Sequence, residues 1–326
     1  MKRAGDCVDQ KRSACAGVDV FMILRPKPTA LELFFTLQGS VLPAILPKIC
    51  VITIIASVVT MIDTFHPKLF AGYTVAPFTL LGLALSIFLG FRNNACYDRW
   101  WEARKQWGQM VNEMRAIGRE VAVLLEKEEP ALRRRIIHLA IAFPHAAAAR
   151  LRDADAAERS RSWLPSDRQA VVTSKRGVAQ AILQELSRET HSLLRRGVIT
   201  DSMHYMFDAR FSTLSSCFAA CERIHTTPLP FAYTLLLHRT AVLFCTMVPF
   251  GIVSAFGVAT PVAAGILAYA FFGLDALGDE LEEPFGTASN DLPLDAMVRV
   301  MEIDLLESID EPNLPPAAQP VGYLLS

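Results

Sequence analysis

The sequence predicts an all-α membrane protein in which helices that cross a bilayer alternate with a charged helical region. Two observations predict this class. Four apolar stretches have the length of membrane spans, and residues 92–230 hold 22 of the 32 Lys and Arg residues. The mean hydropathy of +0.30 is intermediate between a wholly soluble and a wholly embedded chain. The balance of 32 basic against 33 acidic residues gives no bias toward nucleic acid.

Four stretches are long enough and apolar enough to cross a bilayer, which takes about 20 residues. They are residues 41–62, 70–91, 231–252 and 257–275. The second stretch is the clearest, because no charged residue lies between Phe70 and Phe91. The last two share a long uncharged run, from Thr240 to Leu274, that proline and glycine residues interrupt, so we predict two helices that are joined tightly.

The charges beside the spans predict the topology. Basic residues precede the first span and follow the second, whereas the loop between them holds only Lys68. The positive-inside rule then predicts a multi-pass protein of the inner (cell) membrane, with both termini cytoplasmic. Inside the charged region, residues 153–176 are predicted to be a flexible connection. The expected parts are a disordered tail (1–23), a segment with the first two spans (24–91, pore helix about 70–91), a cytosolic helical region (92–230), the last two spans (231–275), an acidic cytosolic helical segment (276–311) and a C-terminal tail (312–326).

The second span carries two stripes of contrasting size. The bulky stripe is Leu83, Ile87 and Phe91, and the small stripe is Gly82, Ser86 and Gly90. Small residues let helices approach closely in lipid, and bulky apolar side chains around a water path form a constriction that gates by dewetting. The pattern therefore suits a ring of identical helices around a pore. Ordinary bundle packing, with the bulky stripe toward lipid, is the alternative.

A run of acidic residues leaves the fourth span. The candidate residues are Asp275, Asp279, Glu282 and Glu283, with Asp291 following after a turn. Three interpretations are open. The carboxylates form a divalent-cation site, they form an acidic vestibule that concentrates cations, or they pair with the arginines that follow the second span. The first of these arginines are Arg92, Arg99 and Arg104.

No catalytic constellation stands out in the sequence. It has no phosphate-binding glycine loop, no G-x-S-x-G and no H-E-x-x-H, and its seven cysteines include no C-x-x-C pair. We therefore predict no enzyme activity and no cofactor, and we assign no metal. His238 and Arg239, at the cytoplasmic edge of the third span, are interpreted as an interfacial anchor, with a functional charge inside the membrane as the alternative.

Several separated motifs resemble the bacterial branch of the bestrophin family. They are Val75-Ala76-Pro77-Phe78, Ile87–Asn94 (IFLGFRNN), Tyr97–Arg104 (YDRWWEAR), Leu237–Thr240 (LHRT), Pro249-Phe250-Gly251, Glu283–Gly286 (EPFG) and Asn290–Asp295 (NDLPLD). They follow one another in the family's order, and the likeness extends over residues 24–306.

The resemblance implies a bestrophin-like pentameric channel, a homo-oligomer in the lipid bilayer whose subunits each have four transmembrane helices and a cytosolic helical region. One pore runs along the second spans, its neck matches Leu83, Ile87 and Phe91, and a second, cytosolic aperture is placed at Ile199. Small monovalent ions would pass without a cofactor. The family's animal members conduct anions, which makes chloride the expected ion. The alternatives are a sodium channel of the same fold, a metal-dependent membrane enzyme that uses the acidic run, and a non-conducting scaffold.

Overall fold

The structure is a computed structural model that describes residues 36, 39–67, 69–70, 72–128 and 130–319. The predicted tail 1–23 and part of the predicted C-terminal tail, residues 320–326, lie outside this range. All regular structure in the described range is helical, as predicted. The elements are α3 (Leu42–Phe65), α4 (Ala76–Leu124), α5 (Pro130–Leu151), α6 (Ala156–Ser160), η1 (Arg161–Trp163), α7 (Ser166–Thr173), α8 (Val178–Arg195), α9 (Asp201–Thr226), α10 (Phe231–Phe256), η2 (Gly257–Ala259), α11 (Thr260–Glu282) and α12 (Leu294–Glu307).

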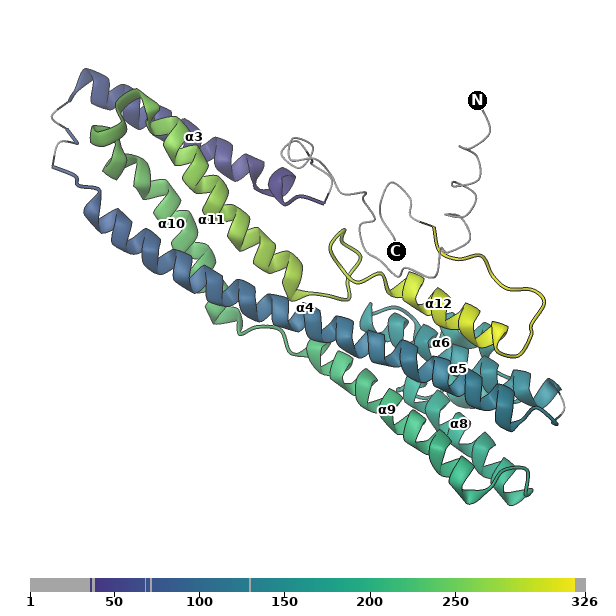
Figure 1. Cartoon of the computed structure of the whole chain (residues 1–326). Helices are drawn as coiled ribbons and strands as arrows, with labels where there is room; N and C mark the ends of the chain where they lie inside the picture. The colour runs from purple at the N-terminus through teal and green to yellow at the C-terminus, as the bar shows by residue number, and fades with distance from the viewer. Residues whose placement is uncertain (1–35, 37–38, 68, 71, 129, 320–326) are drawn as a thin grey trace, which may run out of the picture. The chain divides into compact units, whose positions relative to one another are not determined.

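The chain divides into two compact units, each of which is described by itself. The membrane unit comprises Arg25–Lys105 and Glu222–Asp291. It holds α3, α10, α11 and the first part of α4 (Figure 1). Among the described residues, the helical unit comprises Gln106–Cys221 and the chain from Leu292 onward. Helix α4 runs without interruption from one unit into the other.

The predicted spans are found as helices of the membrane unit. Helices α3, α4 and the combined α10–α11 stretch are each long and apolar enough to cross a membrane. Between α10 and α11, Gly257 has a φ of 51°, which a residue with a side chain rarely adopts, so the chain turns there within the short η2. The two helices are therefore joined tightly, as predicted.

The start of the second span differs from the prediction. We expected the helix over about 70–91, but α4 begins at Ala76, and the described residues before it form bends and turns. Pro77 explains the difference, since proline lacks an N–H donor and is well placed only in the first turn of a helix. Beyond Phe91 the helix continues to Leu124 without a break.

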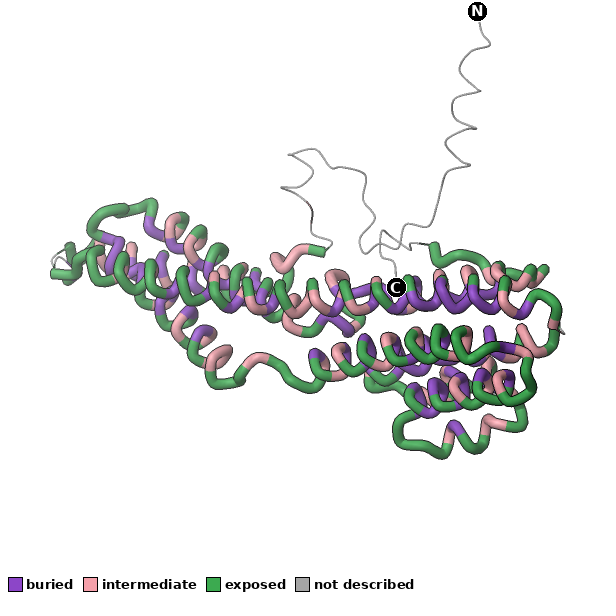
Figure 2. Tube along the Cα trace, turned by 60° about the horizontal axis from the view of Figure 1, so that its bottom comes forward, coloured by how far each residue is buried: buried purple, intermediate pink, exposed green. Residues whose placement is uncertain are grey.

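The core of the membrane unit joins all four of its helices. Helix α11 packs against α3 and α10, and α10 also packs against α3. The rings of Phe244 and Phe271 meet edge to face with centroids 4.8 Å apart, and Leu85 and Leu89 of α4 belong to the same core. Buried and exposed residues alternate along the helices (Figure 2). Many exposed side chains are large and apolar, such as Ile54 at 63% exposure, which is typical of a surface that faces lipid.

The helical unit is built around α5, which packs against α6, α8 and α12. One correction concerns residues 153–176, which contain α6, η1 and α7 instead of a flexible connection. Asp155 caps α6 by accepting hydrogen bonds from two backbone N–H groups, and Arg168 of α7 donates two hydrogen bonds of 2.7 Å to Glu185. Burial opposes ionisation of Glu185, but the hydrogen bonds from Arg168 and Arg188 lower its pKa overall.

Candidate functional site

The bulky stripe of α4 is exposed along its whole length. Leu83, Ile87 and Phe91 are 58%, 48% and 61% exposed in the single chain. On the opposite side of the same helix, Leu85 and Leu89 are 2% and 0% exposed, because they pack into the core of the membrane unit. The stripe is therefore part of the surface of α4 that its own chain leaves uncovered.

The small stripe is divided between two roles. A Cβ atom added at Gly82 would lie 3.0 Å from the ring of Phe244, so Gly82 allows α10 to approach α4 closely. Gly90 is different, because no atom of the described chain would lie within 4 Å of an added Cβ. Ser86 is exposed, and its hydroxyl donates a 2.8 Å hydrogen bond to the carbonyl of Leu83. Ser86 and Gly90 therefore leave a shallow, open surface beside the bulky stripe.

Ile199 does not present an open side chain. It precedes α9 and is 3% exposed in the described chain. The cytosolic aperture at Ile199 stays a prediction.

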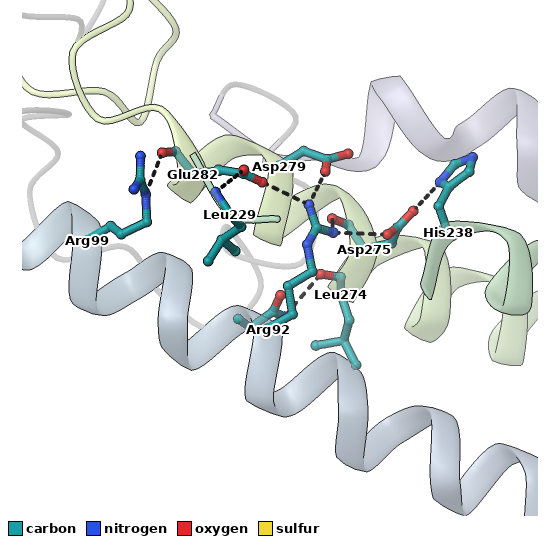
Figure 3. A network of polar contacts seen from close by, with 9 residues as sticks. Arg92, Arg99, Leu229, His238, Leu274, Asp275, Asp279 and Glu282 are labelled. Carbon is teal, nitrogen blue, oxygen red and sulfur yellow. Dashed lines mark hydrogen bonds and ion pairs between the residues drawn. The ribbon is translucent and has the colours of Figure 1, made fainter. Parts of the chain in front are cut away.

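Arg92 is the centre of a buried charge network in the membrane unit (Figure 3). Its side chain is 0% exposed, and it leaves α4 on the side opposite the bulky stripe. One guanidinium nitrogen, Nη1, donates to the carbonyl oxygen and the carboxylate of Asp275 at 3.2 and 3.1 Å. The other, Nη2, contacts Asp279 and also lies 3.4 Å from Glu282. Three carboxylates of α11 thus converge on one arginine of α4.

The network extends to α10 and to the chain that precedes it. His238 Nδ1 lies 2.7 Å from the second carboxylate oxygen of Asp275. Glu282 accepts a 3.1 Å hydrogen bond from the backbone N–H of Leu229, and its carbonyl accepts one from Arg99 (Figure 3). The network therefore ties α4, α10 and α11 together, and buried charges held in this way strongly resist removal of one partner.

The structure distributes the predicted acidic residues over several roles. Asp275, Asp279 and Glu282 make ion pairs with Arg92, as the third interpretation of the run proposed. Glu283 is the C-cap residue of α11, and Asp291 accepts a 2.6 Å hydrogen bond from a backbone N–H at Ala288. No group of three or more His, Cys, Asp and Glu side chains in the described part of the chain is arranged to hold a metal ion.

His238 is the network residue whose role the sequence did not indicate. We interpreted it as an interfacial anchor, but its ring contacts a carboxylate on another helix, 37 positions along the chain. The acidic run indicated the carboxylates of the network, and the arginines after the second span indicated their partners. A lone histidine in an apolar run carries no signal of which carboxylate it meets.

Comparison with known proteins identifies relatives over almost the whole chain. A voltage-dependent anion channel-forming protein of Mesorhizobium japonicum is 41% identical over 298 residues, which are 91% of this chain and 96% of that protein. The voltage-dependent anion channel-forming protein of Escherichia coli K12 is 40% identical over 294 residues, covering 90% of this chain and 96% of that protein. These are names of channel proteins, which supports the prediction that this chain is not an enzyme.

The fold matches solved structures equally well. A crystal structure of a bacterial bestrophin homologue from Klebsiella pneumoniae superposes with a TM-score of 0.79 at 36% identity, covering 82% of this chain and all of that chain. The family described as bacterial and fungal bestrophin proteins matches residues 22–307. The motifs, the helical fold and these matches agree with one another. The chain therefore belongs to the bacterial and fungal branch of the bestrophin family.

Proposed function

We propose that this chain is the subunit of a pentameric ion channel of the cell membrane, which passes small monovalent ions passively through an apolar neck on α4. Anions such as chloride are the proposed permeant class, because relatives at about 40% identity are named anion channel-forming proteins. A sodium channel of the same fold is the alternative. Both termini and the helical unit are proposed to lie in the cytoplasm, in keeping with the basic residues that follow the second span.

The observation that carries this proposal is the exposure of the bulky stripe. Leu83, Ile87 and Phe91 are about half exposed or more in the single chain, whereas Leu85 and Leu89 of the same helix are buried in the core of the membrane unit. Eight residues of helix separate the first from the last, so the stripe extends along about 12 Å of the axis. Five copies around one axis would form an apolar constriction of this length, which suits gating by dewetting.

The neighbouring small residues support close packing between copies. Ser86 and Gly90 lie beside the bulky stripe, and Gly90 has open space where a side chain would be. Small residues at helix interfaces let neighbouring helices approach in lipid, where no hydrophobic force drives association. An adjacent subunit is therefore proposed to pack on this side of α4, while the bulky stripe turns toward the axis. The number of five subunits comes from the family resemblance.

Replacement of Leu83, Ile87 and Phe91 together by alanine tests the neck. We expect a larger single-channel conductance in planar bilayers, because shorter side chains widen the constriction and favour its wetting. The matched control replaces Ile54, Val58 and Met61, an exposed apolar stripe of α3, and is expected to leave conductance unchanged. An unaltered conductance in the first variant, or an equal increase in the control, would contradict the proposed neck.

A further inference from the structure

We infer that Asp98 determines ion specificity by placing negative charge at the cytoplasmic mouth of the proposed neck, where it lowers the preference of the channel for anions over cations. The inference rests on the proposed function, because it requires the bulky stripe of α4 to face the pore. It gives the channel a means of selecting ions by the sign of their charge, which an apolar ring alone does not provide.

Asp98 lies on the same side of α4 as the bulky stripe. Helix α4 is uninterrupted from Ala76 to Leu124, so the direction of each side chain follows from a turn of about 100° per residue. Asp98 is seven residues beyond Phe91, which places it within about 20° of Phe91 and about 10 Å farther along the helix axis. Both residues are exposed. A passage lined by the stripe would therefore meet Asp98 two turns after the neck.

The other charges on this side of α4 cancel each other. Glu102 and Lys105 follow Asp98 within two turns, and Lys105 Nζ lies 2.6 Å from a carboxylate oxygen of Glu102. The carboxylate of Asp98 has no ion pair or hydrogen bond with any residue that the structure describes. Its charge is therefore available to ions in solution.

The arginines of this segment are directed elsewhere. Arg92 is fully buried on the opposite side of α4, where its charge is matched by Asp275 and two further carboxylates. Arg99 turns toward backbone carbonyls of the chain before α10. Arg104 leaves the helix about 120° away from Asp98. The net charge that the stripe side presents in this segment is therefore negative.

Five copies of Asp98 would form a ring of carboxylates beyond the neck. Such rings attract cations and repel anions, and clefts with one sign of charge change local ion concentrations by tenfold or more. In a channel whose relatives are named for anions, this ring would act against anion entry from the cytoplasmic side. Removing it should then increase the preference for anions.

Asp98→Asn tests this inference through the reversal potential in asymmetric sodium chloride. We expect a shift toward the chloride equilibrium potential, with a rise of about tenfold in the permeability ratio of chloride to sodium. Asp98→Glu retains the charge and should behave as the original protein does. Glu126→Gln, which removes an exposed carboxylate just after α4, should leave the reversal potential unchanged.

The outcomes separate this inference from the proposed function. If Asp98→Asn leaves the reversal potential unchanged while the triple alanine neck variant still conducts more, Asp98 has no role in specificity and the neck stands. If the neck variant also behaves as the original protein does, the proposed function is wrong. If the Asp98→Asn variant fails to assemble, the unmodified channel tests the inference instead. Salt screens a charged ring, so the anion preference of the unmodified channel must rise with ionic strength, and a constant preference would overturn the inference.

Discussion

Replacement of Arg92 by methionine would test the buried network of the membrane unit directly. Methionine keeps an unbranched apolar side chain but removes the guanidinium group that three carboxylates share. The three carboxylates are not affected equally, because Asp279 is 60% exposed and Glu282 15%, whereas Asp275 is 2% exposed. Because water already reaches Asp279, the loss of stability in the variant depends chiefly on Asp275.

The expected magnitude follows from the burial of Asp275. Without Arg92, the carboxylate of Asp275 loses the guanidinium group and keeps the 2.7 Å contact of its second oxygen with His238 Nδ1. Breaking a buried ion pair by removing one partner destabilises a protein by about 3–5 kcal/mol, because the remaining charge is uncompensated. At about 2 °C per kcal/mol for a large chain, the midpoint of thermal unfolding should fall by roughly 6–10 °C. The double variant Arg92→Met/Asp275→Asn should recover most of this loss, because it removes the stranded charge.

Thermal unfolding of the detergent-solubilised oligomer, followed by tryptophan fluorescence, measures this effect. The matched control is Lys105→Met, which breaks an ion pair of the same helix whose side chains are 57% and 33% exposed. Exposed pairs contribute about 1 kcal/mol or less, so the control should lower the midpoint by no more than about 2 °C. Equal shifts in the two single variants, or a double variant less stable than Arg92→Met, would refute the reasoning.

Two further predictions concern packing and pH. Gly251→Ala should lower the midpoint of thermal unfolding, because the new Cβ would lie 2.2 Å from the ring of Phe78. Adding Phe78→Ala should restore part of the loss. A midpoint that Gly251→Ala leaves unaffected would contradict the contact. The carboxylate of Glu185 binds Arg168 and Arg188, and its pKa is lowered in the folded protein. This pairing adds stability above the pKa that Glu185 has in the unfolded chain, and the stability is lost as the pH falls through the pKa of Glu185 in the folded protein. Glu185→Gln should therefore flatten the fall of the unfolding midpoint between about pH 5 and 3, and an unchanged slope would count against this account.

The spans and the tight turn between α10 and α11 were predictable because lipid imposes a simple requirement. A helix that crosses it needs about 20 apolar residues, and a glycine with positive φ marks a place where the chain can reverse. The start of α4 was predicted too early, because hydropathy treats the apolar residues from Phe70 onward as equal. Pro77 at the second helical position carried the better signal, since helices commonly accept proline there.

The sequence patterns did not predict the long-range ion pairs. Residues 153–176 are polar, and their composition is typical of a connection, yet Arg159 and Arg168 find carboxylates at Asp295 and Glu185. These partners lie on other helices, so local composition gives no indication of them. The same limit applies to His238, whose contact with Asp275 depends on how α10 and α11 pack. Periodicity predicts which residues share a face, but the partner of that face depends on the tertiary fold.

The buried network also explains how α4 could hold a fixed orientation at a pore. Arg92 is nine residues beyond Leu83, and nine steps of about 100° place the two side chains on opposite sides of the helix. Rotating α4 far enough to bury the bulky stripe would expose hydrophobic positions such as Leu89 and would pull Arg92 away from Asp275. Because separating a buried ion pair costs several kcal/mol, the pairing on one side of α4 determines which residues appear on the other. The stripe and the network are thus two consequences of a single helix orientation, and a variant that weakens the network should also alter the neck.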